Sequence, residues 1–256
     1  MSGQKPRTAL TIAGFDPSGG AGVLADARTF GAFGLEAAAA ITSITFQTPE
    51  KVLGAIHQTA ETLRAQLEPL LESANIVSIK TGMLPTKEIV LAVARFFREA
   101  DLQAPVIDPV ITSSSGHSLM EPDALTALVE NLLPLARVIT PNISEAEALS
   151  GNTIRSEADM RAAAARIRAL GARAVLIKGG HLEAQTEAID VLDDQGRVTV
   201  FRVPRIPGAS LHGSGCVLSA AIAACLGNGM RLEESVSEAK KFVLEVLQKS
   251  NLSISI

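Results

Sequence analysis

The sequence contains no tryptophan, no tyrosine and only two cysteines among its 256 residues. Base-stacking aromatics are therefore scarce, and a formal net charge of −4 argues against nucleic acid as a partner. If Cys216 and Cys225 share one helix, they stand about 13.5 Å apart along its axis, which is too far for a disulfide. A four-cysteine zinc site is excluded by count, and a site of two cysteines and two histidines lacks the close cysteine spacing it needs.

Long apolar runs are also absent near the N-terminus. The apolar stretch at residues 8–14 ends at Asp16 and is too short for a signal-peptide core or a membrane span. Hydrophobic residues make up 47% of the chain, enough for a full core, and no repeat, linker or low-complexity tract divides it. We therefore expect one domain spanning residues 1–256 in a cytoplasmic protein, and the low cysteine usage fits a reducing compartment.

Short β-rich apolar runs alternate with longer segments of helical periodicity. The expected strands are 9–13, 37–44, 76–80, 105–108, 138–140 and 174–178. The expected helices are 21–33, 59–72, 86–99, 122–133, 156–170, 215–226 and 232–249. This alternation predicts an α/β fold with a mainly parallel sheet covered by helices on both faces. Residues 188–192 and 198–203 flank an Asp-Asp-Gln-Gly-Arg turn, which predicts a hairpin at an antiparallel edge of the sheet.

The turn HGSGC at residues 212–216 leads directly into an apolar, small-residue helix. Unpaired backbone N–H groups and the helix dipole at such a start favour a bound anion such as phosphate. The same field lowers the pKa of a thiol, so Cys216 is a candidate base or nucleophile beside that phosphate. A structural turn into a core helix, with an inert buried cysteine, explains this segment alone equally well.

Several other polar loops follow expected strands, at the edge where ligands of open α/β sheets gather. Residues 14–22 form a glycine-rich loop, and Asp26 lies one turn into the helix that follows. Both the loop and the Asp26 carboxylate could either bind a ligand or have a purely structural role. Asn142 and Glu145 suit the water shell of Mg²⁺, although an Asn cap with a first-turn Glu is the simpler interpretation. Asp108 and Lys178 add a carboxylate and a cation to this edge.

Six sequence pieces occur in one order along the chain. They are AGFDPSGGAG at 13–22, KTGML at 80–84, IDPV at 107–110, TPNISEAEAL at 140–149, KGGH at 178–181 and HGSGC at 212–216. Together they resemble the hydroxymethylpyrimidine/phosphomethylpyrimidine kinases of thiamine biosynthesis, within the ribokinase-like superfamily, over about residues 8–248. Most ribokinase-like enzymes carry Asp at the last position of the turn, so Cys216 indicates the pyrimidine branch and its pyridoxal kinase relatives.

This resemblance implies a ribokinase-like three-layer sandwich, ATP and Mg²⁺ as cofactors, and a homodimer. The glycine turn, Gly213, Ser214 and Gly215, would form the anion hole for the transferred phosphoryl group, and Cys216 would take the proton of the substrate hydroxymethyl group. The residues implied for ATP are Asn142, Lys178, Gly213 and Gly215. Those implied for Mg²⁺, largely through water, are Asp108 and Glu145. Those matching positions around the pyrimidine are Gly14, Asp26, Gln47, Met83 and Val110.

The expected function is ATP-dependent phosphorylation of 4-amino-5-hydroxymethyl-2-methylpyrimidine. The chain departs from the family beside the substrate, at Phe15, Leu24 and residues 48–51. Ser114 also replaces the usual lysine and His117 the usual acid, which leaves phosphorylation of the monophosphate open. Three alternatives remain: a pyridoxal or pyridoxine kinase, a non-catalytic pyrimidine- or nucleotide-binding member, and a thiol enzyme that uses Cys216 with His212.

Overall fold

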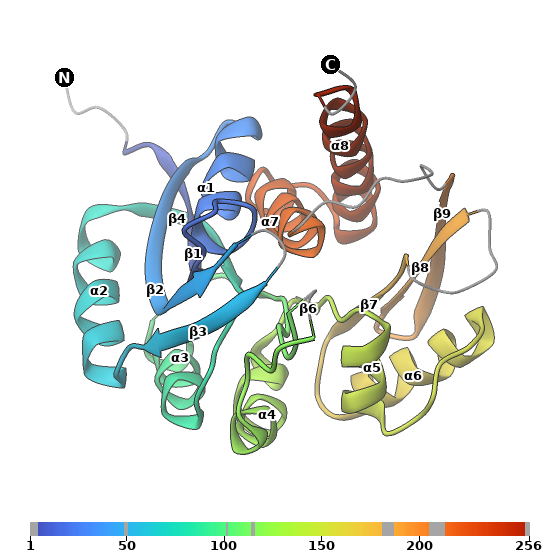
Figure 1. Ribbon diagram of the computed structural model, residues 1–256, viewed down its shortest axis with the longest axis horizontal. Coiled ribbons are helices and arrows are strands. Elements are labelled where there is room, and N and C mark those ends of the chain that lie inside the picture. The colour runs from blue at the N-terminus through green and yellow to red at the C-terminus, as the bar shows by residue number, and fades with distance from the viewer. Residues whose placement is uncertain are drawn as a thin grey trace.

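The computed structural model describes residues 5–48, 51–100, 102–113, 116–180, 187–204 and 213–253. Within these residues nine strands form one sheet in the order β3-β2-β1-β4-β5-β6-β7-β8-β9 (Figure 1). The strands are β1 (Arg7–Phe15), β2 (Glu36–Gln47), β3 (Val52–His57), β4 (Asn75–Thr81), β5 (Val106–Ile107), β6 (Val138–Ile139), β7 (Ala174–Gly179), β8 (Glu187–Asp194) and β9 (Arg197–Pro204).

The six strands from β2 to β7 run parallel, and β3, β8 and β9 add antiparallel edges. The predicted hairpin is confirmed as β8 and β9, which turn at Gln195 and Gly196, both with positive φ. Because the carboxyl ends of the parallel strands lie at one edge, the segments that leave β1, β4, β5, β6 and β7 all begin there.

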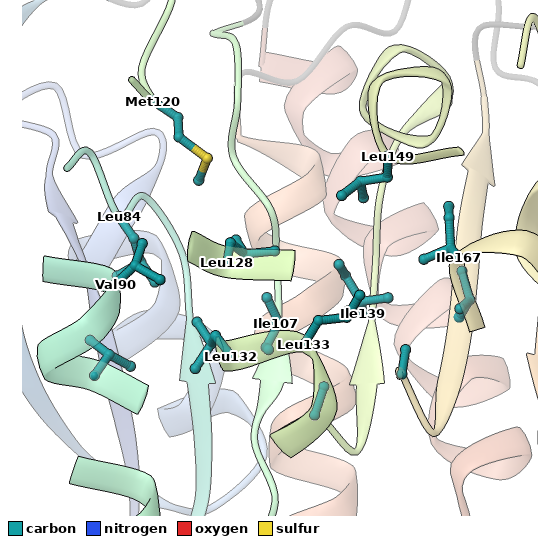
Figure 2. Packing of buried hydrophobic residues seen from close by; sticks show 14 of the residues in the cluster. Leu84, Val90, Ile107, Met120, Leu128, Leu132, Leu133, Ile139, Leu149 and Ile167 are labelled. Carbon is teal, nitrogen blue, oxygen red and sulfur yellow. The ribbon is translucent and has the colours of Figure 1, made fainter. Parts of the chain in front are cut away.

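Helices cover both faces of the sheet, as predicted. They are α1 (Gly22–Ala32), α2 (Ala60–Ser73), α3 (Lys87–Glu99), α4 (Pro122–Ala127), α5 (Ile143–Ser150), α6 (Glu157–Ala169), α7 (Ser214–Gly227) and α8 (Leu232–Ser253). One apolar cluster joins the sheet to α2–α6, and Figure 2 shows its centre at Ile107 and Ile139 beside Leu132 and Leu133. A second cluster joins the opposite face to α1, α7 and α8. No helix in the described ranges is long and apolar enough to cross a membrane.

Two elements differ from the sequence prediction. The helix expected at 122–133 is α-helical only to Ala127 and continues as a π-helical turn (Leu128–Leu132) and a 3-10 turn (Leu133–Leu135). Pro134 contributes to the change, because proline lacks the N–H that would continue the α-helical hydrogen bonds. Strand β3 was not predicted, because its apolar run is short and Gly54 interrupts it. Pairing with β2 holds this segment in a strand.

Candidate active site

The N-terminus of α7 lies against the loop that follows β1. Gly213 adopts φ of 81° at the N-cap, and a Cβ there would lie 2.1 Å from the carbonyl oxygen of Gly20. Gly22 has φ of 59°, and its Cβ would lie 2.2 Å from the carbonyl oxygen of Gly14. Only glycine fits both positions, so these residues let the two loops approach each other closely.

Asp16 builds the loop after β1, a role that sequence reasoning missed. Its carboxylate accepts the N–H and O–H of Ser18 at 2.8 and 2.7 Å and the N–H of Ala21 at 2.9 Å. Gln47, at the end of β2, donates a further hydrogen bond to it. Burial raises the pKa of Asp16, but the combined effect of these hydrogen bonds is larger. The pKa therefore lies below its usual value. Gln47 therefore lies beside the loop that follows β1.

Cys216 lies in the first turn of α7, partly buried, and its thiol accepts the N–H of Gly22. The sequence predicted a lowered thiol pKa, and the structure contradicts this. Burial raises the pKa of Cys216 to about 11, with Lys80 opposing and the carboxylates Asp108 and Asp26 adding to the rise. Desolvation and nearby negative charge thus outweigh the field at the start of the helix.

Asp26 points from α1 into a closed polar cluster beneath this turn. Its two oxygens lie 2.9 and 2.8 Å from Nζ of Lys80, and Thr11 donates a hydrogen bond to it at 2.6 Å. Both members of the ion pair are 0% exposed. Burial raises the pKa of Asp26, and contact with Lys80 opposes this rise. For Lys80, burial lowers the pKa, but Asp26, Cys216 and Asp108 together raise it above its usual value. Asp26 and Gln47 thus have different partners in this structure.

Lys80 was part of the KTGML piece but was not singled out from the sequence. The signal was available, because a lysine that ends a buried strand needs a partner of opposite charge. Gly82 makes room for it, since a Cβ at Gly82 would lie 3.1 Å from its ammonium nitrogen. The partner, Asp26, lies 54 residues earlier and could not be identified from spacing.

Asp108 and Lys178 meet at the centre of the edge. Nζ of Lys178 lies 2.9 Å from Oδ1 of Asp108, and Ser219 and Thr140 donate hydrogen bonds to the same carboxylate at 3.1 and 3.3 Å. Burial raises the pKa of Asp108, but Lys178 and Lys80 hold it below its usual value. A Cβ on Gly215 would lie 3.1 Å from Nζ of Lys178. The ammonium therefore lies beside the first turn of α7, where an anion would bind.

Asn142 and Glu145 form a capping box at the start of α5. The N–H of Glu145 donates to Asn142 Oδ1 at 2.9 Å, and the N–H of Asn142 donates to Glu145 Oε2 at 2.8 Å. The simpler interpretation is therefore correct for the helix. Burial raises the pKa of Glu145 to about 7, with Lys178 opposing and Asp108 adding to the rise.

The acidic residues fit Mg²⁺ held through water better than direct ligation. Both oxygens of Asp108 already accept hydrogen bonds, and both carboxylates are nearly buried. No group of three His, Cys, Asp or Glu residues suited to a metal occurs in the part of the chain that the structure describes. Carboxylate oxygens are nevertheless the donors that Mg²⁺ takes up beside nucleotide phosphates and water.

Gly14, Met83 and Val110 are the remaining residues predicted to lie beside the substrate. A Cβ on Gly14 would lie 3.1 Å from Sδ of Met83, and Thr42 donates a hydrogen bond to the Met83 carbonyl at 2.6 Å. A cavity of about 310 Å³ beside Met83 is lined by Ala55, His57, Pro85 and residues 117–122. Val110 follows Asp108 and is half-buried. Ser114, His181 and His212 lie outside the described residues.

Comparisons with known proteins show the family and the fold. The family model for phosphomethylpyrimidine kinase matches residues 16–255. A hydroxymethylpyrimidine/phosphomethylpyrimidine kinase of Rhizobium meliloti is 43% identical over 236 residues, covering 92% of this chain and 88% of that protein. An ADP complex of Bacillus subtilis pyridoxal kinase has a TM-score of 0.85 at 39% identity, covering 93% of this chain and 90% of that one.

A solved phosphomethylpyrimidine kinase from Clostridium difficile has a TM-score of 0.83 at 35% identity, covering 94% of this chain and 99% of that one. The overall fold is thus shared over nearly the whole length of these proteins. The chain belongs to the phosphomethylpyrimidine kinase family.

Proposed function

We propose that the protein transfers the γ-phosphoryl group of ATP to the hydroxymethyl group of 4-amino-5-hydroxymethyl-2-methylpyrimidine, in thiamine biosynthesis. The observation that carries this proposal is the meeting of three groups at the start of α7. Cys216 lies in its first turn, Lys178 lies beside Gly215, and Asp108 pairs with Lys178 at 2.9 Å. Similarity to the kinase of Rhizobium meliloti supports the choice of substrate.

Phosphoryl transfer requires alignment and neutralisation of charge more than covalent help from the protein. The N–H groups of Gly213, Ser214 and Gly215 at the start of α7 offer hydrogen bonds to the transferred group. Lys178 supplies a positive charge beside them, and burial of its stem limits the positions of its ammonium. When bound, Mg²⁺ neutralises charge on the triphosphate, and we assign Asp108 and Glu145 to its water shell.

Cys216 is the group we assign to the substrate proton. As the substrate oxygen bonds to the phosphoryl group, its proton moves to Sγ and ADP leaves. A thiolate whose pKa is about 11 is a stronger base than an ordinary cysteine thiolate, although its population is small at neutral pH. The Lys80 ammonium favours the ionised form, so the buried ion pair beneath α7 supports this step.

The pyrimidine contacts we assign are Gly14, Gln47, Met83 and Val110. Gln47 is best placed to recognise a ring amino group directly, because it lies at the end of β2 and is partly exposed. Asp26 is fully buried and bound to Lys80, so its contribution in this conformation is to hold Lys80 and the start of α1.

A pair of cysteine variants on one helix tests the assignment of Cys216. In Cys216→Ala, turnover of the hydroxymethylpyrimidine should fall by about 10²-fold or more, which is the usual contribution of a proton-transferring group. Cys225→Ala, nine residues further along α7 and fully buried, is the matched control and should keep wild-type turnover. Equal activity of both variants would remove Cys216 from the mechanism.

A pyridoxal kinase is the second candidate, favoured by the similarity to the Bacillus subtilis enzyme. Both substrates are flat methylated heteroaromatic alcohols that the same phosphoryl site can serve. Gln47→Leu separates them: an aminopyrimidine that depends on the Gln47 amide should lose about 10-fold to 100-fold in kcat/KM, because an unmatched buried polar group costs about 1 to 3 kcal/mol. An unchanged pyrimidine kcat/KM in this variant would contradict the assigned contact. A cytoplasmic location stays a prediction.

A further inference from the structure

A buried chain of polar contacts connects α8 to the end of β7. Lys240 of α8 forms an ion pair with Asp190 of β8, and their side chains are only 8% and 7% exposed. The other carboxylate oxygen of Asp190 accepts the backbone N–H of Gly179 at 2.9 Å. Gly179 is the residue next to Lys178, so this chain ends beside the cation of the phosphoryl site.

The backbone around Lys178 is fixed from both neighbouring strands. On the β6 side, the N–H of Lys178 donates to the carbonyl of Pro141 at 2.8 Å. On the β8 side, Gly179 pairs with Ile189 so closely that a Cβ would lie 2.1 Å from the Ile189 carbonyl oxygen and 2.8 Å from Cε of Met160. The Asp190 carboxylate supplies the hydrogen-bond acceptor for Gly179 at this crowded point.

The position of the Lys178 ammonium is sensitive to this backbone. Its Nζ lies 2.9 Å from Asp108 and close to Gly215 at the start of α7. A displacement of about 1 Å in a group that aligns reacting atoms can cost on the order of 100-fold in rate. A contact that fixes the residue next to Lys178 is therefore expected to affect the rate of phosphoryl transfer.

We propose that Asp190 is a positioning residue for Lys178, with Lys240 as its counter-charge. The carboxylate holds the Gly179 N–H, and Lys240 makes the buried negative charge tolerable. The proposal rests on the proposed function, because it assumes that Lys178 meets the γ-phosphoryl group. None of these residues is among those that we assign to the pyrimidine, so the predicted effect is confined to the nucleotide side of the reaction.

Two double variants separate the hydrogen bond from the ion pair. Asp190→Asn with Lys240→Met removes both charges but keeps an oxygen for the Gly179 N–H. Asp190→Leu with Lys240→Met removes the charges and the acceptor. The Leu variant should lose about 10-fold to 100-fold in kcat with an unchanged KM for the pyrimidine, and the Asn variant should stay within about threefold of wild type.

Asp193 offers a matched control on the same strand. It is 2% exposed, accepts the N–H of Gly196 at 2.7 Å and pairs with Arg168 at 3.1 Å. It lies opposite Val175, near the other end of β7. Asp193→Leu with Arg168→Met should lower the unfolding temperature as the Asp190 variant does, yet keep wild-type kcat.

A binding readout makes the test independent of the pyrimidine. The ratio of Kd for ADP to Kd for a non-hydrolysable ATP analogue reports the contribution of the γ-phosphate. This ratio should fall about 10-fold in the Leu double variant and remain unchanged in the Asn and Asp193 variants. If wild-type protein binds both nucleotides but phosphorylates no pyrimidine, the proposed function fails while this ratio still decides the role of Asp190.

An unchanged ratio and kcat in a folded Leu double variant would overturn the proposal, as would equal losses in the Asp193 control. If the Leu double variant does not fold, Asp190→Ser with Lys240→Met replaces it, because the shorter side chain does not reach Gly179. The same losses are then expected, and their absence has the same meaning.

Discussion

At the scale of single residues, the thiol of Cys216 is the group most affected by its surroundings. Charged groups from four elements act on it: Lys80 of β4, Asp26 of α1, Asp108 after β5 and Lys178 of β7. Burial and the two carboxylates favour the neutral thiol, and the two lysines favour the thiolate. The resulting pKa of about 11 makes the thiol mostly neutral at physiological pH.

The alkylation rate of Cys216 tests this balance. In a Cys225→Ala background, the rate with iodoacetamide should rise about tenfold per pH unit from pH 7 to 10, because only the thiolate reacts. Adding Lys80→Met with Asp26→Asn removes both charges of the buried pair. Lys80 lowers the thiol pKa more than Asp26 raises it, so the pKa should rise and alkylation at pH 9 should become slower. A rate that levels off below pH 9 would contradict the raised pKa.

Gly215 allows stability and activity to be separated at one position. Gly215→Ala should stabilise α7 by up to about 1 kcal/mol, because alanine is the better helix former. The new methyl group would lie 3.1 Å from Nζ of Lys178 and displace the ammonium. Thermal unfolding and kcat measured together should therefore change in opposite directions. A variant with wild-type kcat would show that the ammonium position is not limiting.

At the scale of elements, the start of α5 combines a helix cap with a carboxylate of the site. Glu145 has a folded-state pKa of about 7 against a usual value of 4.5, so the folded protein holds an extra proton between these values. The contribution of Glu145 to the free energy of unfolding is greatest below about pH 4.5 and is lost as the pH rises through 7. Glutamine keeps the shape and remains neutral throughout.

Glu145→Gln should therefore gain stability relative to wild type as the pH rises from 5 to 8, by up to about 3 kcal/mol. Urea unfolding of both proteins at the two pH values measures this difference. A stability difference that is equal at pH 5 and pH 8 would show that Glu145 is already ionised in the folded protein at pH 5.

Elements with regular periodicity were predictable from the sequence, and elements that depend on distant partners were not. The six parallel strands follow from alternating apolar runs, and the β8–β9 hairpin follows from its turn. Strand β3 depends on pairing with β2, and the π-helical turn before Pro134 depends on packing of Leu132 and Leu133 into the core. The loops of the site converge because their strands are parallel neighbours, which topology alone predicts.

The charges within the site were less predictable. The likeness to the family identified Cys216, Lys178 and Asp108, but the Lys80–Asp26 pair and the Lys240–Asp190 pair span 54 and 50 residues. Such pairs appear only when the fold brings their strands and helices together. The direction of the Cys216 pKa shift also depends on burial, which the sequence could not supply.

At the scale of the whole molecule, we propose that residues 1–256 form one domain and that the protein is a homodimer. Ile44, Phe46 and Ile56 of the β2–β3 hairpin are exposed large hydrophobic residues. Ile44 and Phe46 are two residues apart and Ile44 lies opposite Ile56, so all three share one face of the hairpin. Exposed apolar patches of this kind are typical of protein contacts. A second copy of the chain is the partner that we assign to this patch.

Sedimentation velocity should show a wild-type dimer and a Phe46→Glu monomer, because a charge at the centre of an apolar contact is costly. Leu91→Glu is the control, since Leu91 is an exposed leucine on α3, outside this hairpin, and its variant should stay dimeric. A monomeric wild type, or a dimeric Phe46→Glu, would place the contact elsewhere or remove it.

A competition between two substrates tests whether the protein phosphorylates the hydroxymethylpyrimidine. Purified protein is incubated with ATP, Mg²⁺ and equal concentrations of hydroxymethylpyrimidine and pyridoxal, and the phosphorylated products are resolved by mass spectrometry. We expect pyrimidine monophosphate to form faster than pyridoxal phosphate; a diphosphate would extend the activity to the second step despite Ser114. Pyridoxal phosphate as the main product, or no phosphorylated pyrimidine, would contradict the account.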